Sequence, residues 1–190
     1  MGLMLSQQPV ADALLDRDPL ALVIGMVLDQ QIPLEKAFSS PYVLTERLGH
    51  VPDAAEIAGM PADDLVAIFS EPPALHRFPG SMAKRVQAMC QALVEQYDGD
   101  VSRVWTGAAD GRDLLKRVAA LPGFGNQKAQ IFVALLGKQY GVDLPGWREA
   151  AGEYGPKGTY KSVADIRDAE SLGRVREYKK QMKAAAKAKA

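Results

Sequence analysis

A short glycine-containing segment, residues 121–129 (Leu-Pro-Gly-Phe-Gly-Asn-Gln-Lys-Ala), has the residues to bind an anion. Gly123 and Gly125 lie two residues apart, and glycine adopts positive φ freely, so the backbone can turn sharply and leave its N–H groups pointing outward. The apolar sequence from Ala129 onward predicts a helix, whose positive dipole end would face the same turn. The pattern therefore predicts a phosphate site.

The sequence before this turn predicts a second helix. Residues 111–120 place Leu114, Leu115 and Val118 at three- and four-residue spacing with charged residues between them, which is the pattern of an amphipathic helix. The sequence thus predicts a helix, a tight turn and a helix over residues 111–137. Such a turn also serves as a plain corner between helices, so a purely structural role is the alternative.

This arrangement resembles the helix-hairpin-helix element that grips one DNA strand through its phosphates in many repair proteins. Two further segments, Leu28–Ala37 and Met82–Asp100, resemble the corresponding segments of the HhH-GPD superfamily of base-excision DNA glycosylases. Helical periodicity recurs along the chain and strand-like alternation is almost absent, so we predict an all-α fold. The resemblance implies a single unit, 1–190, with a six-helix lobe at 19–137, a second lobe from 1–18 and 138–190, and an active cleft between them.

The resemblance also implies which residues meet DNA. Gln31, with Gln30 beside it, would reach into the DNA at the lesion, although both glutamines could instead cap and solvate a helix junction. Lys84 and Arg85 follow Ser81, the expected cap of a long helix to Tyr97, and would lie on another surface near DNA; solvated basic residues are common at such places. The residues implied for phosphate binding are Gly123, Phe124, Gly125, Gln127 and Lys128.

Glycoside cleavage calls for a carboxylate near the anomeric carbon, because the transition state has oxocarbenium character, and the base must first leave the stack. The resemblance implies Asp143, although Leu-Pro-Gly-Trp replaces the family's usual polar continuation after it. A helix cap is therefore the alternative role for Asp143. Bifunctional relatives use a hairpin lysine as a Schiff-base amine. Gln127 stands at that position and Lys128 is turned about 100° away, so we predict no lyase activity.

Cysteine and histidine offer little chemistry. Cys90 is the single cysteine, so neither an intramolecular disulfide nor the four-cysteine iron–sulfur site of some relatives can form, and its helical spacing among apolar residues indicates a core thiol. His50 and His76 lie in loop-like surroundings without an evident acidic partner, and we assign them no role. We expect neither a cofactor nor a metal.

Formal net charge is zero, but the charges are uneven. The sequence after Ser171 is strongly basic with Glu177 as its one acid, and could attract DNA phosphates or simply form a solvated helix end. Asp18 and Pro19 predict the start of a helix that runs to about Gln31. Its apolar run 20–28 is too short for a bilayer and indicates a buried core helix, and nothing at the N-terminus indicates export. We expect a cytoplasmic, nucleoid-associated monomer that does not bind membranes.

The sequence therefore leads to a main hypothesis and two alternatives. The main hypothesis is DNA base-excision repair by a monofunctional DNA N-glycosylase, which hydrolyses the N-glycosidic bond of a damaged base flipped into the interlobe cleft. Its partner would be double-stranded DNA containing the damaged base. One alternative is a non-catalytic helix-hairpin-helix DNA (lesion)-binding protein. The other is a helical interaction protein in which residues 121–125 form only a corner.

Overall fold

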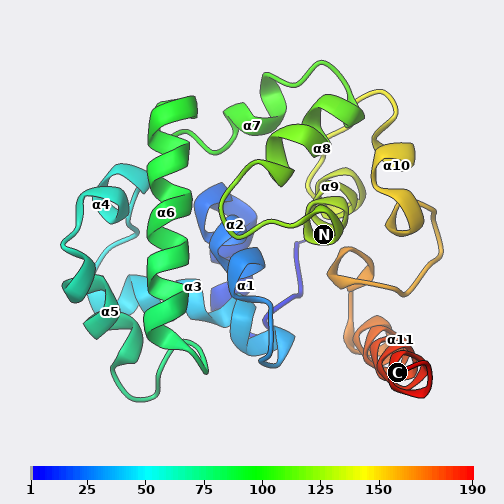
Figure 1. Cartoon of the computed structure of the whole chain (residues 1–190), viewed down its shortest axis with the longest axis horizontal. Coiled ribbons are helices and arrows are strands. Elements are labelled where there is room, and N and C mark those ends of the chain that lie inside the picture. The colour runs from blue at the N-terminus through cyan, green and yellow to red at the C-terminus, as the bar shows by residue number, and fades with distance from the viewer. Residues whose placement is uncertain (1) are drawn as a thin grey trace.

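The computed structural model describes residues 2–190, and within this range it contains helices and loops but no strand (Figure 1). The predicted all-α fold is confirmed. The elements in chain order are α1 (Pro9–Arg17), α2 (Pro19–Leu28), α3 (Leu34–Leu48), α4 (Ala54–Gly59), α5 (Ala62–Ser70), α6 (Pro79–Tyr97), α7 (Arg103–Thr106), α8 (Gly111–Ala119), α9 (Asn126–Gln139), α10 (Trp147–Ala150), the 3₁₀ helices η1 (Gly152–Tyr154) and η2 (Val163–Asp165), and α11 (Ala169–Ala188).

Helix α2 is the centre of the core. It begins where the sequence predicts, with Asp18 accepting a hydrogen bond from the Leu20 N–H at 3.0 Å and Pro19 in the first turn. Every residue from Leu20 to Leu28 is buried, as the apolar run 20–28 predicts. The helix ends at Leu28, slightly before the expected end at Gln31, because the chain turns sharply there and Gln31 has a φ of 58°. Residues 29–31 therefore form a corner, in which Asp29 and Gln30 are half-buried and Gln31 is exposed.

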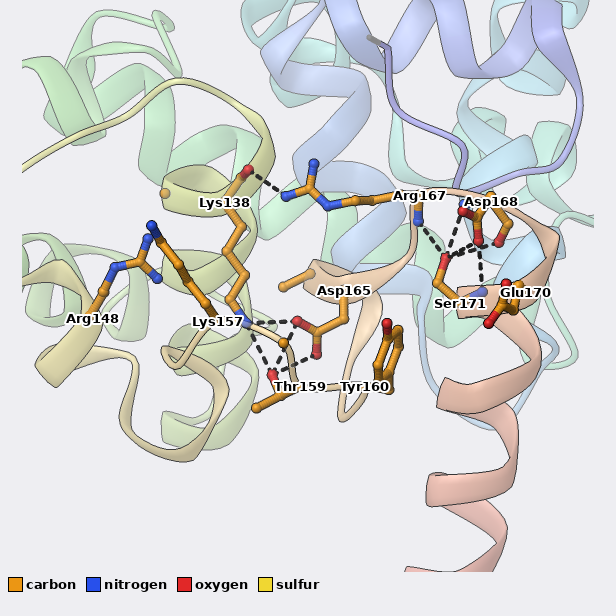
Figure 2. Close-up of a pocket in the computed structure, with 13 residues that line it drawn as sticks. Lys138, Arg148, Lys157, Thr159, Tyr160, Asp165, Arg167, Asp168, Glu170 and Ser171 are labelled. Carbon is orange, nitrogen blue, oxygen red and sulfur yellow. Dashed lines mark hydrogen bonds and ion pairs between the residues drawn. The ribbon is translucent and has the colours of Figure 1, made fainter.

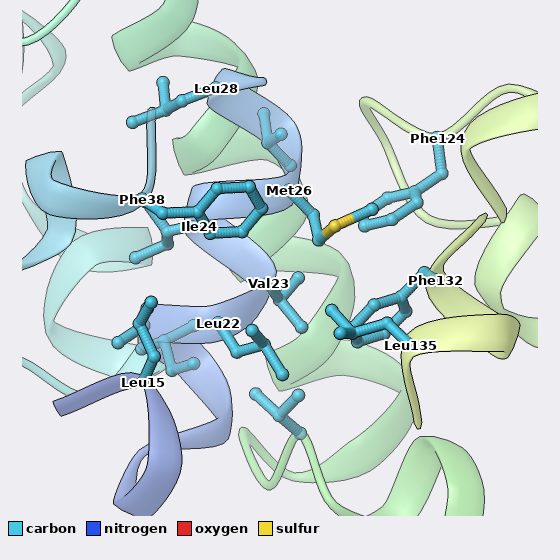
Figure 3. Close-up of a cluster of buried hydrophobic side chains, with 14 of the residues drawn as sticks. Leu15, Leu22, Val23, Ile24, Met26, Leu28, Phe38, Phe124, Phe132 and Leu135 are labelled. Atoms are coloured by element: carbon cyan, nitrogen blue, oxygen red, sulfur yellow. The ribbon is translucent and has the colours of Figure 1, made fainter. Parts of the chain in front are cut away.

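Two sides of α2 pack against different parts of the chain (Figure 3). On one side Phe38 of α3 lies so close to Gly25 that a Cβ on this glycine would be 2.6 Å from the ring. On the other side Phe124 and Phe132 of the hairpin approach α2, with ring centroids 5.7 Å apart. Burial of these aromatic rings contributes most per residue to such a core. The packing holds the hairpin turn beside the end of α2.

The predicted hairpin is formed by α8 and α9. Asp110 caps α8 through the Asp113 N–H at 2.8 Å. At the end of the hairpin away from the turn, the Gly111 N–H donates to the Pro145 carbonyl at 2.8 Å, and the Trp147 ring covers Gly137 so tightly that a Cβ there would be 2.4 Å from it. The chain that follows α9 is therefore fixed at this far end before η1 returns along the helix.

Helix α6 begins earlier than predicted. Its first residue is Pro79 and Phe78 is the N-cap, so the expected capping role of Ser81 is wrong. Proline is well suited to the first helical position because its φ is already helical and the missing N–H would be unpaired there. Lys84 and Arg85 consequently lie in the second turn instead of the first.

Some contacts between elements lie within the predicted 19–137 lobe, and others join it to the second predicted lobe. Helices α4 and α5 pack on α6, α1 packs on α2 and α3, and α10 and η2 pack on α9. The lobe boundaries stay a prediction. None of the helices between residues 2 and 190 combines the length and apolar character needed to cross a bilayer.

Candidate DNA interface

The two glycines of the hairpin turn have different roles. Gly123 has a φ of 92°, and a Cβ there would lie 3.2 Å from Val27 and 3.3 Å from the Arg85 side chain. Gly125 has an ordinary extended conformation, with a φ of −83° and a ψ of 176°, and a Cβ there would meet nothing within 4 Å. Positive φ is therefore needed at Gly123 alone. Gly125 instead leaves the approach to the start of α9 open.

Backbone donors are available at this opening. The first hydrogen bond of α9 runs from the Ala129 N–H to the Gly125 carbonyl at 2.9 Å. Within residues 2–190, the N–H groups of residues 125–128 have no protein acceptor, as expected for the first turn of a helix. Phe124 differs, because its N–H donates to the Leu121 carbonyl at 3.1 Å and its ring is buried. Phe124 thus anchors the turn in the core, and the open donors follow it.

The hairpin turn meets the corner at the end of α2. Lys128 Nζ donates to the Val27 carbonyl at 3.3 Å, and Gln30 Nε2 donates to the same carbonyl at 2.9 Å. Arg85 of α6 donates to Gln30 Oε1 at 3.1 Å. The structure therefore brings Gly123, Lys128, Gln30 and Arg85 together.

Three further side chains predicted to contact DNA are exposed on the surface. Gln31 is exposed at the corner. Gln127 is exposed on the first turn of α9, and its Nε2 donates to the Tyr154 hydroxyl of η1 at 2.9 Å. Lys84 is exposed too, but one helical step turns it about 100° from Arg85. Within the described chain Lys84 makes no hydrogen bond or ion pair, and the structure does not bring it into the cluster.

Three acidic residues lie around this end of the hairpin. Glu35 of α3 forms an ion pair with Arg176 of α11. Glu153 Oε2 accepts from Lys161 Nζ at 3.1 Å and from the Tyr178 hydroxyl at 3.5 Å. Asp29 has no hydrogen bond or ion pair to its side chain within residues 2–190, although its charge acts on Lys128. Burial lowers the pKa of Lys128, and Asp29 opposes that shift.

Asp143 lies elsewhere. It is exposed and accepts a 3.3 Å hydrogen bond from Trp147 Nε1, in the segment fixed at the far end of the hairpin. The rise of α9 from Gln127 to Gly137 is about 15 Å, so the structure does not bring Asp143 to the turn or to Gln31. The alternative role of Asp143 as a helix cap is wrong, because Gly146 is the N-cap of α10 and no side chain within residues 2–190 caps that helix.

A pocket of about 440 Å³ lies at the same far end of α9 (Figure 2). Lys138 Nζ lies 2.6 Å from Asp165 Oδ1, and the two side chains are only 6% and 4% exposed. Thr159 donates to the same carboxylate at 3.2 Å. These buried charges satisfy one another, and the cluster joins the chain after α10 to α9, at the opposite end of that helix from the hairpin turn.

Sequence reasoning missed His76. Its buried ring donates from Nε2 to the Leu28 carbonyl at 3.1 Å and to the Gln30 carbonyl at 2.9 Å, and Nδ1 accepts from the Phe78 N–H at 2.9 Å. His76 therefore holds the corner in place from a loop far along the chain. The expectation that neither histidine has an acidic partner is wrong for His50, whose Nε2 lies 2.8 Å from Glu56.

Protonation of His76 and protonation of His50 should have opposite effects on the stability of the fold as the pH falls. Burial lowers the pKa of His76, so below the ordinary histidine pKa of about 6.5 the unfolded chain takes up the proton more readily and stability falls. We expect His76→Gln to lessen the loss of melting temperature between about pH 6.5 and pH 5. His50→Gln is the control, because hydrogen bonding to Glu56 raises the pKa of His50 and its protonation opposes that loss. An unchanged acid-side loss in His76→Gln would contradict this assignment.

The remaining reactive side-chain types are the cysteine thiol and the metal ligands. Cys90 is buried as predicted, and burial raises the pKa of its thiol to about 12, which leaves it unreactive. In the part of the chain that the structure describes, no group of three or more histidine, cysteine, aspartate or glutamate side chains is arranged to hold a metal ion.

The fold and the site together define an all-helical protein with a helix-hairpin-helix element whose open end carries unpaired backbone donors. A family model described as HhH-GPD superfamily base excision DNA repair protein matches residues 24–190. The chain belongs to the HhH-GPD superfamily of base-excision DNA repair proteins. Comparisons with curated proteins and with solved structures gave no significant match.

Proposed function

We propose that this protein is a monofunctional DNA N-glycosylase of base-excision repair. The observation that carries the proposal is the hairpin turn, where unpaired N–H groups and the positive end of α9 lie open beside Gly125. Family membership supports DNA as the ligand. One strand would be held by its phosphate at this turn, since such contacts position a protein on DNA without reading its sequence.

The corner after α2 is the proposed lesion-reading element. Gln31 is exposed and has a φ of 58°, a conformation that costs a residue other than glycine roughly 1–3 kcal/mol. His76 holds the carbonyls on either side of Asp29, and Arg85 holds the side chain of Gln30. A corner fixed in this way is preorganised to occupy the space that a flipped base leaves in the stack.

We assign the carboxylate of the reaction to Asp29. It lies in the corner, next to the hairpin, and unlike Glu35 and Glu153 its side chain has no partner within residues 2–190. A free carboxylate at this place can stabilise the positive charge that develops on the sugar as the base leaves, before water completes the hydrolysis. Asp143 stays the prediction of the family pattern, and the same assay can test both residues.

The proposal that the enzyme lacks lyase activity rests on the hairpin side chains. Gln127 presents an amide, which cannot form a Schiff base, and this amide donates to the hydroxyl of Tyr154. Lys128 Nζ is directed to the Val27 carbonyl at the end of α2. A monomer acting in the cytoplasm at the nucleoid remains our proposal for the setting of this activity.

The test is incubation with duplexes that carry alkylated, deaminated or oxidised bases. We expect release of a free base from at least one substrate, and strand breakage only after alkali, because the product is an intact abasic site. Strand scission without alkali would overturn the monofunctional assignment. Tight binding to lesions with no base release from any substrate would instead support the non-catalytic lesion-binding protein.

A further inference from the structure

Helix α11 has two dissimilar halves. Its start is fixed to the body: Asp168 caps it through the Ser171 N–H at 2.7 Å, and Leu172 and Val175 are buried. Every residue from Lys179 to the end of the chain is exposed. Figure 1 shows α11 nearly end-on at the edge of the molecule, and Figure 2 shows it leaving the body below Ser171. About half of this helix therefore has no protein surface to pack against.

Most basic residues of α11 gather on one face, whereas Arg174, which pairs with Glu170, lies on the opposite side of the helix. Their spacing of three, four, seven and eleven residues places them within about a quarter of the helix circumference, because each residue turns the helix by about 100°. The acids Glu170 and Glu177 lie outside this face. The residues of this basic stripe are Arg176, Lys179, Lys180, Lys183 and Lys187.

The basic stripe begins at the candidate DNA interface. Arg176 pairs with Glu35 in the first turn of α3, shortly after the corner formed by residues 29–31. Lys179 lies near enough to Lys128 for the two charges to interact. Burial is the main cause of the lowered pKa of Lys128, and the charges of Arg85 and Lys179 lower that pKa further. The stripe thus continues the positive surface of the hairpin outward along α11.

The exposed part of the stripe lacks a partner of opposite charge. Lys179 and Lys183, and then Lys183 and Lys187, stand four residues apart, where like charges destabilise a helix. No acid follows Glu177 in the sequence, and within residues 2–190 no ion pair involves these three lysines. A polyanion that runs along the helix would remove this repulsion. Residues 179–188 extend about 15 Å, which covers several phosphates of a DNA strand.

We propose that α11 is a duplex-binding arm, whose basic stripe binds the phosphate backbone of DNA flanking the nucleotide held at the hairpin. This inference rests on the proposed function only because it takes DNA as the ligand. It does not require that the protein cleaves a glycosidic bond. The arm adds sequence-independent affinity and fixes how the duplex lies across the interface. Its contribution falls as salt rises, because bound phosphates release counterions.

The experiment compares the full-length protein with Lys183→Gln/Lys187→Gln in binding to an undamaged duplex of two helical turns over a series of salt concentrations. The double variant should lower the slope of log affinity against log salt by about 2, at roughly 0.9 per phosphate contact. Arg112→Gln/Lys157→Gln removes the same charge from exposed residues at the far end of the hairpin and should leave the slope unchanged. Glutamine keeps the helix propensity of lysine, and circular dichroism checks this.

Hydrogen exchange gives a second measurement that does not depend on substitution. The amides of residues 179–188 should exchange rapidly in the free protein and slowly on DNA, since only bound DNA would hold this half of the helix. The arm hypothesis alone would be overturned by three results together: the parent protein binds DNA, the double variant has the same salt slope as the parent, and residues 179–188 gain no protection on DNA. A parent with no affinity for duplex DNA would overturn the arm and the proposed function together.

Discussion

Gly125→Asp is expected to lower the affinity for duplex DNA about 100-fold while leaving the fold as stable as before or slightly more so. Gly125 is the N-cap of α9, and a Cβ there meets nothing within 4 Å. Aspartate is among the best N-cap residues, because its carboxylate accepts hydrogen bonds from the N–H groups of the first turn. It would raise the stability by a few tenths of a kcal/mol over glycine. These N–H groups are the donors proposed for phosphate.

The loss of affinity has two sources. The aspartate occupies the donors, each worth about 1.5–3 kcal/mol with a charged acceptor, and it repels the phosphate that would have bound them. Gly125→Ser caps the helix without charge and should lose less affinity, whereas Gly59→Asp adds the same charge at an open position on α4 and should lose none. Affinity is measured at fixed salt, with thermal unfolding in parallel. Parental affinity in a stably folded Gly125→Asp would remove the hairpin as the anchor.

The hairpin and the central helix could be predicted because their signals are local. Residues 111–137 contain two helix patterns and a glycine turn, and Asp18 with Pro19 marks the start of α2. Such features depend on backbone conformation and on neighbours in the sequence. The sequence could not indicate that positive φ is needed at Gly123 and not at Gly125. This difference depends on Val27 and Arg85, which approach Gly123 from distant parts of the chain.

The surroundings of the site could not be predicted, because they depend on long-range packing. Asp143 is kept at the far end of the hairpin by Trp147, whose ring lies on Gly137. No spacing in the sequence indicates which way the chain turns after α9. His76 likewise acts through carbonyls that precede it by more than 40 residues. Nothing in the sequence around His76 indicates that its ring binds the carbonyls of Leu28 and Gln30, so only the fold reveals this role.

The chemical step offers the sharpest comparison between sequence and structure, because they favour different carboxylates. Asp29→Asn is expected to keep lesion affinity and to slow single-turnover base release by on the order of 100-fold or more. This is the pattern for a group that stabilises charge mainly in the transition state. Asparagine matches the shape of aspartate, and no hydrogen bond or ion pair to the Asp29 side chain is lost within residues 2–190. Lys128 does lose the nearby negative charge that opposes the effect of its burial.

Asp143→Asn, in the same assay, is the matched variant. It also replaces an aspartate by its amide, but Asp143 is exposed and lies at the other end of α9. Within residues 2–190 the one hydrogen bond to its side chain comes from Trp147. From its position we expect base release close to the parental rate. A large loss in Asp143→Asn with none in Asp29→Asn would restore the residue implied by the family pattern and move the reacting nucleotide away from the corner. Full activity in both variants would show that neither carboxylate stabilises the transition state.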